Sequence, residues 1–133
     1  MTAEDAGKLL LRIALGLLIL LHGIAKLRFG LGDVATSLAR AGLPAALGYL
    51  VYVGEVVAPL LVIAGWWTRV GALLIAGNMA VALVIGHWGH IFQVEPHGGL
   101  LLEVQFMFLF GAIAVALLGA GRFSLGGAQG RWN

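Results

Sequence analysis

The chain has 133 residues, of which 61% are apolar and 11% are charged, and its mean hydropathy is +1.01. A soluble domain carries about 25% charged residues, so this chain cannot cover a globular surface with polar side chains. Its 8 Lys and Arg residues outnumber the 6 acidic ones only slightly and are scattered, which excludes a nucleic-acid-binding surface. Because there is no cysteine, disulfides, thiol catalysis and iron–sulfur clusters are excluded. The composition predicts one small domain embedded in the lipid bilayer.

Four apolar stretches follow one another along the chain, at residues 9–27, 45–67, 70–92 and 99–119. Each has close to the 20 or so residues that a helix needs to cross a hydrocarbon core of about 30 Å. Barrel strands are about half as long, and the stretches show no alternation of polar and apolar residues. We therefore predict an all-α fold, an integral membrane four-helix bundle, as a single domain of residues 1–133.

The longest connecting segment, residues 28–44, contains a second kind of pattern. Val34 and Leu38 are four residues apart, and Asp33 precedes them as a candidate N-cap. This spacing predicts a short interfacial helix between the first and second spans. The Gly-rich residues 120–133 are predicted to form a flexible tail.

The distribution of positive charge predicts the orientation. Four spans place the two termini and the turn at residues 68–69 on the same side of the membrane. That side carries Lys8, Arg12, Arg69, Arg122 and Arg131, whereas the other carries Lys26, Arg28 and Arg40. Since Lys and Arg are enriched in cytoplasmic loops, we predict that both termini lie in the cytoplasm.

Each predicted span carries ionisable residues, which cost about 2.5–3.5 kcal/mol in a membrane and therefore indicate a functional site. They are His22 and Lys26 in the first span, Glu55 in the second, His87 in the third and Glu103 in the fourth. His22 and Lys26 are four residues apart and share a helix face. All five lie in the outer half of the predicted bundle. We expect them to form one polar cluster, with Lys26 compensating Glu55 or Glu103.

Two other interpretations of these residues stay open at this point. A buried Lys–Glu pair can be purely structural and set the register of the helices. Together with His90 and His97, the cluster also resembles a set of metal ligands. No Glu-x-x-His motif occurs, however, so the di-iron bundle pattern is missing and no metal is assigned.

A structural role is predicted for three arginines, Arg12, Arg69 and Arg122, at the opposite end of the bundle. For Arg12 the candidates are a lipid phosphate and the carbonyl ends of the second or fourth helix. Asn78, in the third span, is expected to form a hydrogen bond between helices.

Several of these residues stand in a recognisable order. The first segment carries an Arg, a Gly and a His-Gly-x-x-Lys motif, at Arg12, Gly16, His22, Gly23 and Lys26. The second carries Glu, Pro and a Gly-x-x-Thr-Arg ending, at Glu55, Pro59, Gly65, Thr68 and Arg69. A third motif follows Glu103, Gly-Ala-Gly-Arg-x-Ser-Leu at residues 119–125. Over residues 9–125 the chain resembles the DoxX family of small bacterial membrane proteins, although Ala120 and Gly126 replace the usual Pro and Asp.

The resemblance implies a four-helix fold in the cell inner membrane and a redox setting, with a quinone as the expected ligand. Relatives are described as subunits of thiosulfate:quinone oxidoreductases or as partners in thiol and oxidative-stress complexes. Lys26, Glu55 and Glu103 would then be catalytic, and His22 and His87 would complete the ligand site. The expected partners are a redox protein that supplies electrons and further copies of the chain.

Two other function classes compete with this hypothesis. A non-catalytic membrane protein that binds a lipid or a small apolar solute, or assists assembly, would use the polar cluster only structurally. A channel or transporter would need an oligomer with a continuous polar path, and the predicted inner half is blocked by Leu and Ala.

Overall fold

The computed structural model describes all residues from Met1 to Asn133, and its regular secondary structure is helical. The α-helices are α1 (Ala3–Phe29), α2 (Gly32–Arg40), α3 (Leu50–Tyr52), α4 (Ala58–Ala64), α5 (Thr68–Val81) and α6 (Glu103–Leu118). Two 3₁₀-helices are η1 (Ala45–Tyr49) and η4 (Trp88–His90), and two π-helices are η2 (Val53–Val57) and η3 (Ala82–Gly86).

Three continuous helical segments are long and apolar enough to cross a membrane. They are Ala3–Phe29, Ala45–Ala64 and Thr68–Gly86, which correspond to the first three predicted spans. The fourth predicted span, 99–119, is shortened to the 16 residues of α6. Residues 99–102 do not join the helix, because the backbone N–H of Leu101 donates to Gln93 in the preceding loop at 2.8 Å.

The predicted short helix after the first span is present as α2, which begins at Gly32. Asp33 lies in its first turn, next to the N-terminal N–H groups, and Leu31 occupies the N-cap without a side-chain hydrogen bond. The expectation that Asp33 caps this helix was therefore wrong by two residues.

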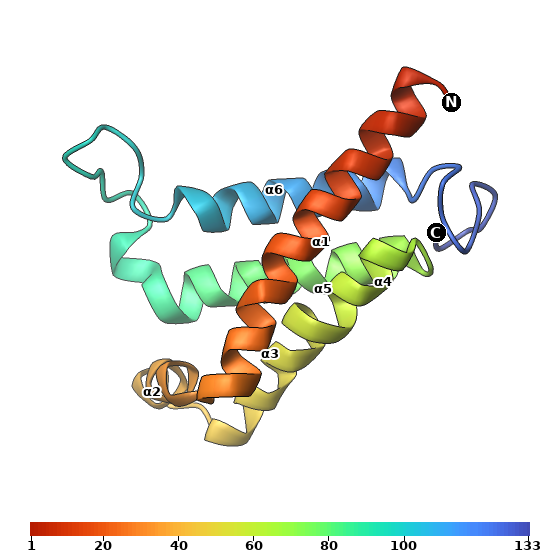
Figure 1. Ribbon diagram of the computed structural model, residues 1–133. Coiled ribbons are helices and arrows are strands. Elements are labelled where there is room, and N and C mark those ends of the chain that lie inside the picture. The colour runs from red at the N-terminus through yellow and green to blue at the C-terminus, as the bar shows by residue number, and fades with distance from the viewer.

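The helices cross one another in a simple arrangement (Figure 1). Helices α5 and α6 run antiparallel side by side, and α1 crosses α6 obliquely and packs against α4. Both termini lie at one end of the molecule, which we call the terminal end. The α2 helix and the loop of residues 91–102 lie away from it, at what we call the loop end.

Small residues allow the helices of the core to approach closely. The buried core is formed by Leu15, Ile19, Ala58, Val62, Ala72, Ile75, Met79, Ala112 and Val115. At Gly71 an added Cβ would lie 2.9 Å from the backbone carbonyl oxygen of Ala58, so the backbones of α5 and α4 are in close contact there. Such contacts replace the hydrophobic driving force that is missing between helices in lipid.

The terminal end is held together by Arg12, which is only 2% exposed. Its guanidinium donates to the carbonyl oxygens of Ala120 at 2.5 Å, Phe123 at 2.8 Å and Ile63 at 3.3 Å. These carbonyls belong to the last turn of α4 and to the segment after α6. Arg12 therefore binds backbone carbonyls on both segments, one of the two alternatives derived from the sequence.

Arg69 plays a similar part at the start of α5. Its guanidinium donates to the carbonyl oxygens of Ala116 and Leu117 at 2.8 and 3.1 Å. These carbonyls lie in the last turn of α6, where the helix itself offers no N–H partner. Arg69 also donates to the carbonyl oxygen of Asn133 at 3.2 Å. Arg122, in contrast, is exposed and forms no side-chain hydrogen bond.

Residues 120–133, expected to be a flexible tail, fold back against the terminal end in a series of turns. The side-chain oxygen of Asn133 accepts from the hydroxyl of Thr68 at 2.8 Å and from its backbone N–H at 3.3 Å. The backbone N–H groups of Leu125 and Gly126 donate to Ala64 and Gly65 at 3.1 and 2.8 Å. The mobility of this segment stays a prediction, and amide exchange at these positions measures it.

Candidate functional site

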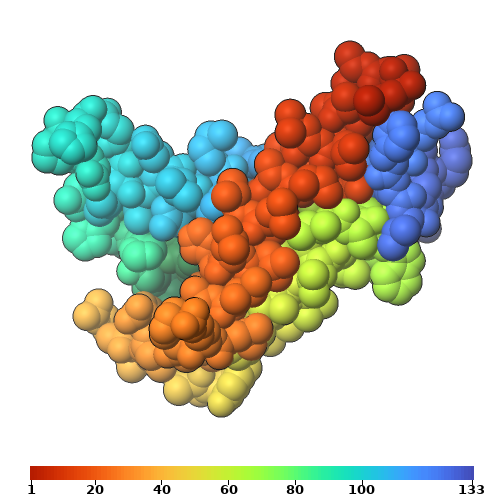
Figure 2. All heavy atoms as spheres, viewed as in Figure 1, coloured from red at the N-terminus to blue at the C-terminus, as the bar shows by residue number.

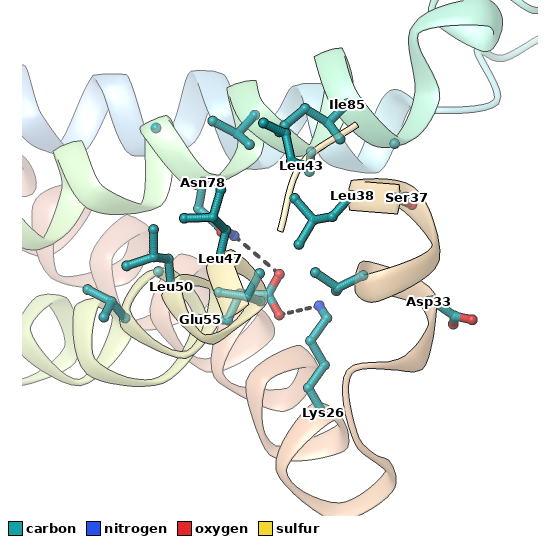
Figure 3. Close-up of a pocket in the computed structure, with 18 of the residues that line it drawn as sticks. Lys26, Asp33, Ser37, Leu38, Leu43, Leu47, Leu50, Glu55, Asn78 and Ile85 are labelled. Carbon is teal, nitrogen blue, oxygen red and sulfur yellow. Dashed lines mark hydrogen bonds and ion pairs between the residues drawn. The ribbon is translucent and has the colours of Figure 1, made fainter. Parts of the chain in front are cut away.

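Glu55 forms the centre of a polar cluster near the loop end (Figure 3). It lies in the π-helix η2 and is 4% exposed. One carboxylate oxygen pairs with the ammonium group of Lys26 from α1. The other accepts a hydrogen bond from the side-chain amide of Asn78 in α5 at 3.2 Å. Three different helical segments thus converge on one carboxylate.

Two glycines make this convergence sterically possible. An added Cβ at Gly23 would overlap the carbonyl group of Glu55, so α1 reaches η2 only because this position has no side chain. An added Cβ at Gly54 would lie 2.5 Å from the Cβ of Asn78. Gly23, next to His22, and Gly54, next to Glu55, therefore set the distances between α1, η2 and α5.

Both π-helices of the chain lie at this cluster. Glu55 is the central residue of η2, and His87 follows directly after η3 with a backbone φ of −139°. A π-turn inserts an extra residue into the helix and redirects the side chains on that turn, and such turns are frequent at functional sites. The backbone thus departs from α-helical geometry where the polar side chains gather.

A cavity of about 780 Å³ lies on one side of the ion pair, between the α2–α3 region and the α5–η3 segment. Lys26, Glu55 and Asn78 line its polar part, and most of its wall is apolar, with Leu38, Leu47 and other side chains. Figure 2 shows a notch between the segment that contains α2 and the α5–α6 arm. Asp33 also borders the cavity, but its carboxylate points away from Glu55 (Figure 3).

A second, smaller cavity of about 140 Å³ also borders this ion pair. Both cavities are lined by Lys26, Glu55, Ala82 and His87. The smaller one is completed by residues of α1, α5 and α6, which include His22, Gln105 and Phe108. The Lys26–Glu55 pair is therefore part of the wall that the two cavities share.

The structure brings together four of the five residues expected in the cluster. His22, Lys26, Glu55 and His87 all line the smaller cavity. Glu103 does not join them: it is exposed at the start of α6, its carboxylate is beside Gly99, and it lines neither cavity. Because α6 begins at Glu103, the Glu103 side chain lies at the N-terminal end of this helix.

The hydrogen bond between helices expected at Asn78 is confirmed by its bond to Glu55 at 3.2 Å, although Asn78 was not expected in the site itself, and Gln105 was not singled out. The signal that could have assigned Asn78 to the site is its place in an apolar span, on a helix next to the one that carries Glu55. The alternative of a metal centre gains no geometric support, since no group of three or more His, Asp or Glu side chains could hold a metal ion. His90, the last residue of η4, and His97, in the loop that follows, are exposed and line neither cavity.

Comparison with known protein families gives one match, to the DoxX family over residues 7–88. The matched region contains His22, Lys26, Glu55, Asn78 and His87, and it ends before α6. Neither the curated proteins nor the solved structures include a match to the chain. Since the family match covers more than half of the sequence and the helices are apolar enough to span a bilayer, the chain is a membrane protein of the DoxX family.

Proposed function

We propose that this protein is the quinone-interacting subunit of a redox complex in the cell inner membrane. The observation that carries the proposal is the position of Lys26, Glu55 and Asn78 at the polar part of a mainly apolar cavity of about 780 Å³. Ligand cavities have volumes of about 300–1,000 Å³ and combine apolar walls with a few directed polar groups.

The polar groups suit the two carbonyl oxygens of a quinone ring. The ammonium group of Lys26 has three hydrogens, of which one is used by Glu55, and the amide of Asn78 has two, of which one is used by Glu55. Each group therefore keeps a donor for an acceptor in the cavity. The carboxylate of Glu55 holds both donors in place and, as a proton acceptor, suits a ligand that gains or loses protons.

The apolar wall suits the tail of a membrane-soluble quinone. Leu43, Leu47, Leu50, Leu73 and Leu74 line the cavity and are also exposed on the surface of the chain. In a bilayer these side chains would contact hydrocarbon, so the cavity opens toward lipid. A ligand that dissolves in the membrane would enter from the side, head first toward Lys26.

We also propose that the segments Ala3–Phe29, Ala45–Ala64 and Thr68–Gly86 form a four-helix membrane bundle with the shorter α6. The distribution of Lys and Arg supports an orientation in which the termini face the cytoplasm. A partner protein or substrate supplies the electrons, since the sequence offers no thiol or thiolate-bound cluster for this purpose.

Titration of purified protein in lipid nanodiscs with decylubiquinone tests the proposal. The Lys26→Met/Glu55→Gln double variant removes both charges together, and Glu103→Gln is the matched control outside the cavities. Loss of a hydrogen bond from a charged donor costs about 1.5–3 kcal/mol, so we expect Kd to rise about 10-fold to 100-fold in the double variant. The control should bind like the wild type. Equal Kd values for all three proteins would refute the proposal.

A second candidate, a non-catalytic binding protein for a lipid or small apolar solute, is favoured by the exposed leucines of the cavity wall. Native mass spectrometry of the protein extracted from membranes distinguishes the two. A co-purified phospholipid that decylubiquinone does not displace supports this alternative, whereas its displacement supports the quinone site.

A further inference from the structure

The smaller cavity has a different character from the larger one. Besides the shared wall, it contains His22 from α1 and Gln105 from α6. Gln105 is two residues from the start of α6, about 3 Å along the helix axis, and His87 ends the α5–η3 segment. The cavity therefore lies close to the ends of two helices. Its volume of about 140 Å³ has room for several water molecules, each of which takes about 30 Å³ in the liquid.

His22 lines this cavity, and its ring is held by a hydrogen bond within α1. Its Nδ1 lies 2.9 Å from the carbonyl oxygen of Leu18. A carbonyl oxygen only accepts, so Nδ1 carries the hydrogen of this bond, and Nε2 has no hydrogen-bond partner in the chain. The ring is held edge-on to Phe108, with 5.6 Å between ring centroids. The side chain is exposed, whereas Glu55 at the inner wall is buried.

We infer that the smaller cavity is a hydrated proton antechamber that connects Glu55 with the outside of the molecule through His22. The inference rests on the proposed function, in which a ligand in the larger cavity exchanges protons with Glu55. Water reaches the cavity at the ends of α6 and of the α5–η3 segment. Nε2 of His22 takes up a proton from this water and releases it to the cavity waters, and the last water protonates the carboxylate of Glu55. The reverse sequence releases it, and no electrons move in this step.

The groups that face the cavity fit this role. Its titratable side chains are His22 and Lys26 from α1, Glu55 from η2 and His87 after η3. Helix α6 contributes only Val104, Gln105 and Phe108, none of which titrates. The ligand and the protons thereby use two separate cavities that share one ion pair, so a hydrophobic ligand in the larger cavity leaves the smaller one open to protons.

Cysteine accessibility tests the hydration of the antechamber without any ligand. Because the chain has no cysteine, each introduced residue is the only thiol. Gln105→Cys and the buried Met79→Cys place a thiol in the smaller cavity, Leu74→Cys places one in the larger cavity, and Leu117→Cys is a lipid-facing control. Apolar surroundings suppress the reactive thiolate, so a charged, membrane-impermeant methanethiosulfonate should modify the first two at least about 10-fold faster than the control.

The outcomes separate this inference from the proposed function. If Gln105→Cys and Met79→Cys react no faster than Leu117→Cys, the antechamber is dry and the inference is overturned. Decylubiquinone should protect Leu74→Cys from a lipid-soluble maleimide and leave Gln105→Cys reactive. If the smaller cavity is reactive and decylubiquinone protects neither position, the quinone site fails and the antechamber stands.

A pH-jump measurement in nanodiscs tests the role of His22. The infrared carboxyl signal of Glu55, identified by its loss in Glu55→Gln, reports arrival of the proton. We expect His22→Phe to slow this signal by about 100-fold, the lower range for loss of a positioned proton-transfer group. The variant His90→Phe, at a residue that lines neither cavity, should match the wild type. An unchanged rate in His22→Phe, or a Glu55 signal that does not respond to pH, overturns the inference.

Discussion

Replacement of Arg12 by Met is the sharpest test of how the terminal end is held together. The guanidinium of Arg12 donates to three carbonyl oxygens, at 2.5, 2.8 and 3.3 Å. Met has a similar length and no donor, so Arg12→Met removes all three hydrogen bonds without opening a large cavity. The acceptors Ala120 and Ile63 stay partly or fully buried and lose their partner.

The expected loss follows from the geometry of these contacts. Hydrogen bonds from a charged donor contribute about 1.5–3 kcal/mol each, and the two short ones together give about 3–6 kcal/mol. Part of this is offset, because the variant also removes a buried charge whose Nε has no hydrogen-bond partner. With about 1–3 kcal/mol for that unsatisfied group, we expect a net loss of about 2–3 kcal/mol in the free energy of unfolding. Arg12→Lys keeps the charge but not the planar set of N–H donors, and its free energy of unfolding should fall by about half as much.

Equilibrium unfolding in detergent micelles measures this loss, with Arg122→Met as the matched control. Arg122 is exposed and forms no side-chain hydrogen bond, so its replacement should change the free energy of unfolding by less than about 0.5 kcal/mol. Amide exchange adds a local readout: the N–H groups of Leu125 and Gly126 should exchange faster in Arg12→Met. Equal stability of the Arg12 and Arg122 variants would refute the reasoning.

Three further predictions use the same unfolding assay. Glu55→Gln alone leaves the charge of Lys26 uncompensated and should cost about 3–5 kcal/mol, whereas the double variant with Lys26→Met should cost clearly less; equal costs would contradict this. Gly54→Ala places a Cβ against Asn78 and should cost about 1–3 kcal/mol by overpacking, which a compensating Asn78→Gly would relieve. Asn133→Ala removes the side-chain acceptor at the start of α5 and should cost about 0.5–2 kcal/mol, while the exposed Gln129→Ala should cost nothing measurable.

The long helices were predictable because length and hydropathy are local properties of a sequence. The structure departs from the prediction where local chemistry overrides hydropathy. Helix α1 begins at Ala3, six residues before its apolar stretch, because Thr2 and Asp5 form a capping box that starts the helix in polar sequence. Residues 99–102 include three leucines and look helical, yet their backbone pairs with the loop: the N–H of Glu95 donates to Gly99 at 2.7 Å.

The membership of the site was predictable only in part. His22 and Lys26 share a face through simple helical spacing, and that inference needs no tertiary information. The position of Glu55 depends on a π-turn, which apolar periodicity does not indicate. Glu103 was expected in the same cluster, and a difference of four residues in the start of α6 leaves it outside both cavities.

The distribution of interactions bears on the alternative in which the Lys26–Glu55 pair is only structural. A buried ion pair contributes little net stability compared with apolar side chains of similar volume. The register of the segments around Glu55 is already set by the close contacts of Gly23 and Gly54, and the terminal end is tied separately by Arg12. A purely structural pair would duplicate these contacts at a cost in desolvation. A pair with spare hydrogen-bond donors at a cavity can bind a ligand, which apolar side chains cannot do. We therefore expect a variant without the pair to fold but to lose ligand binding.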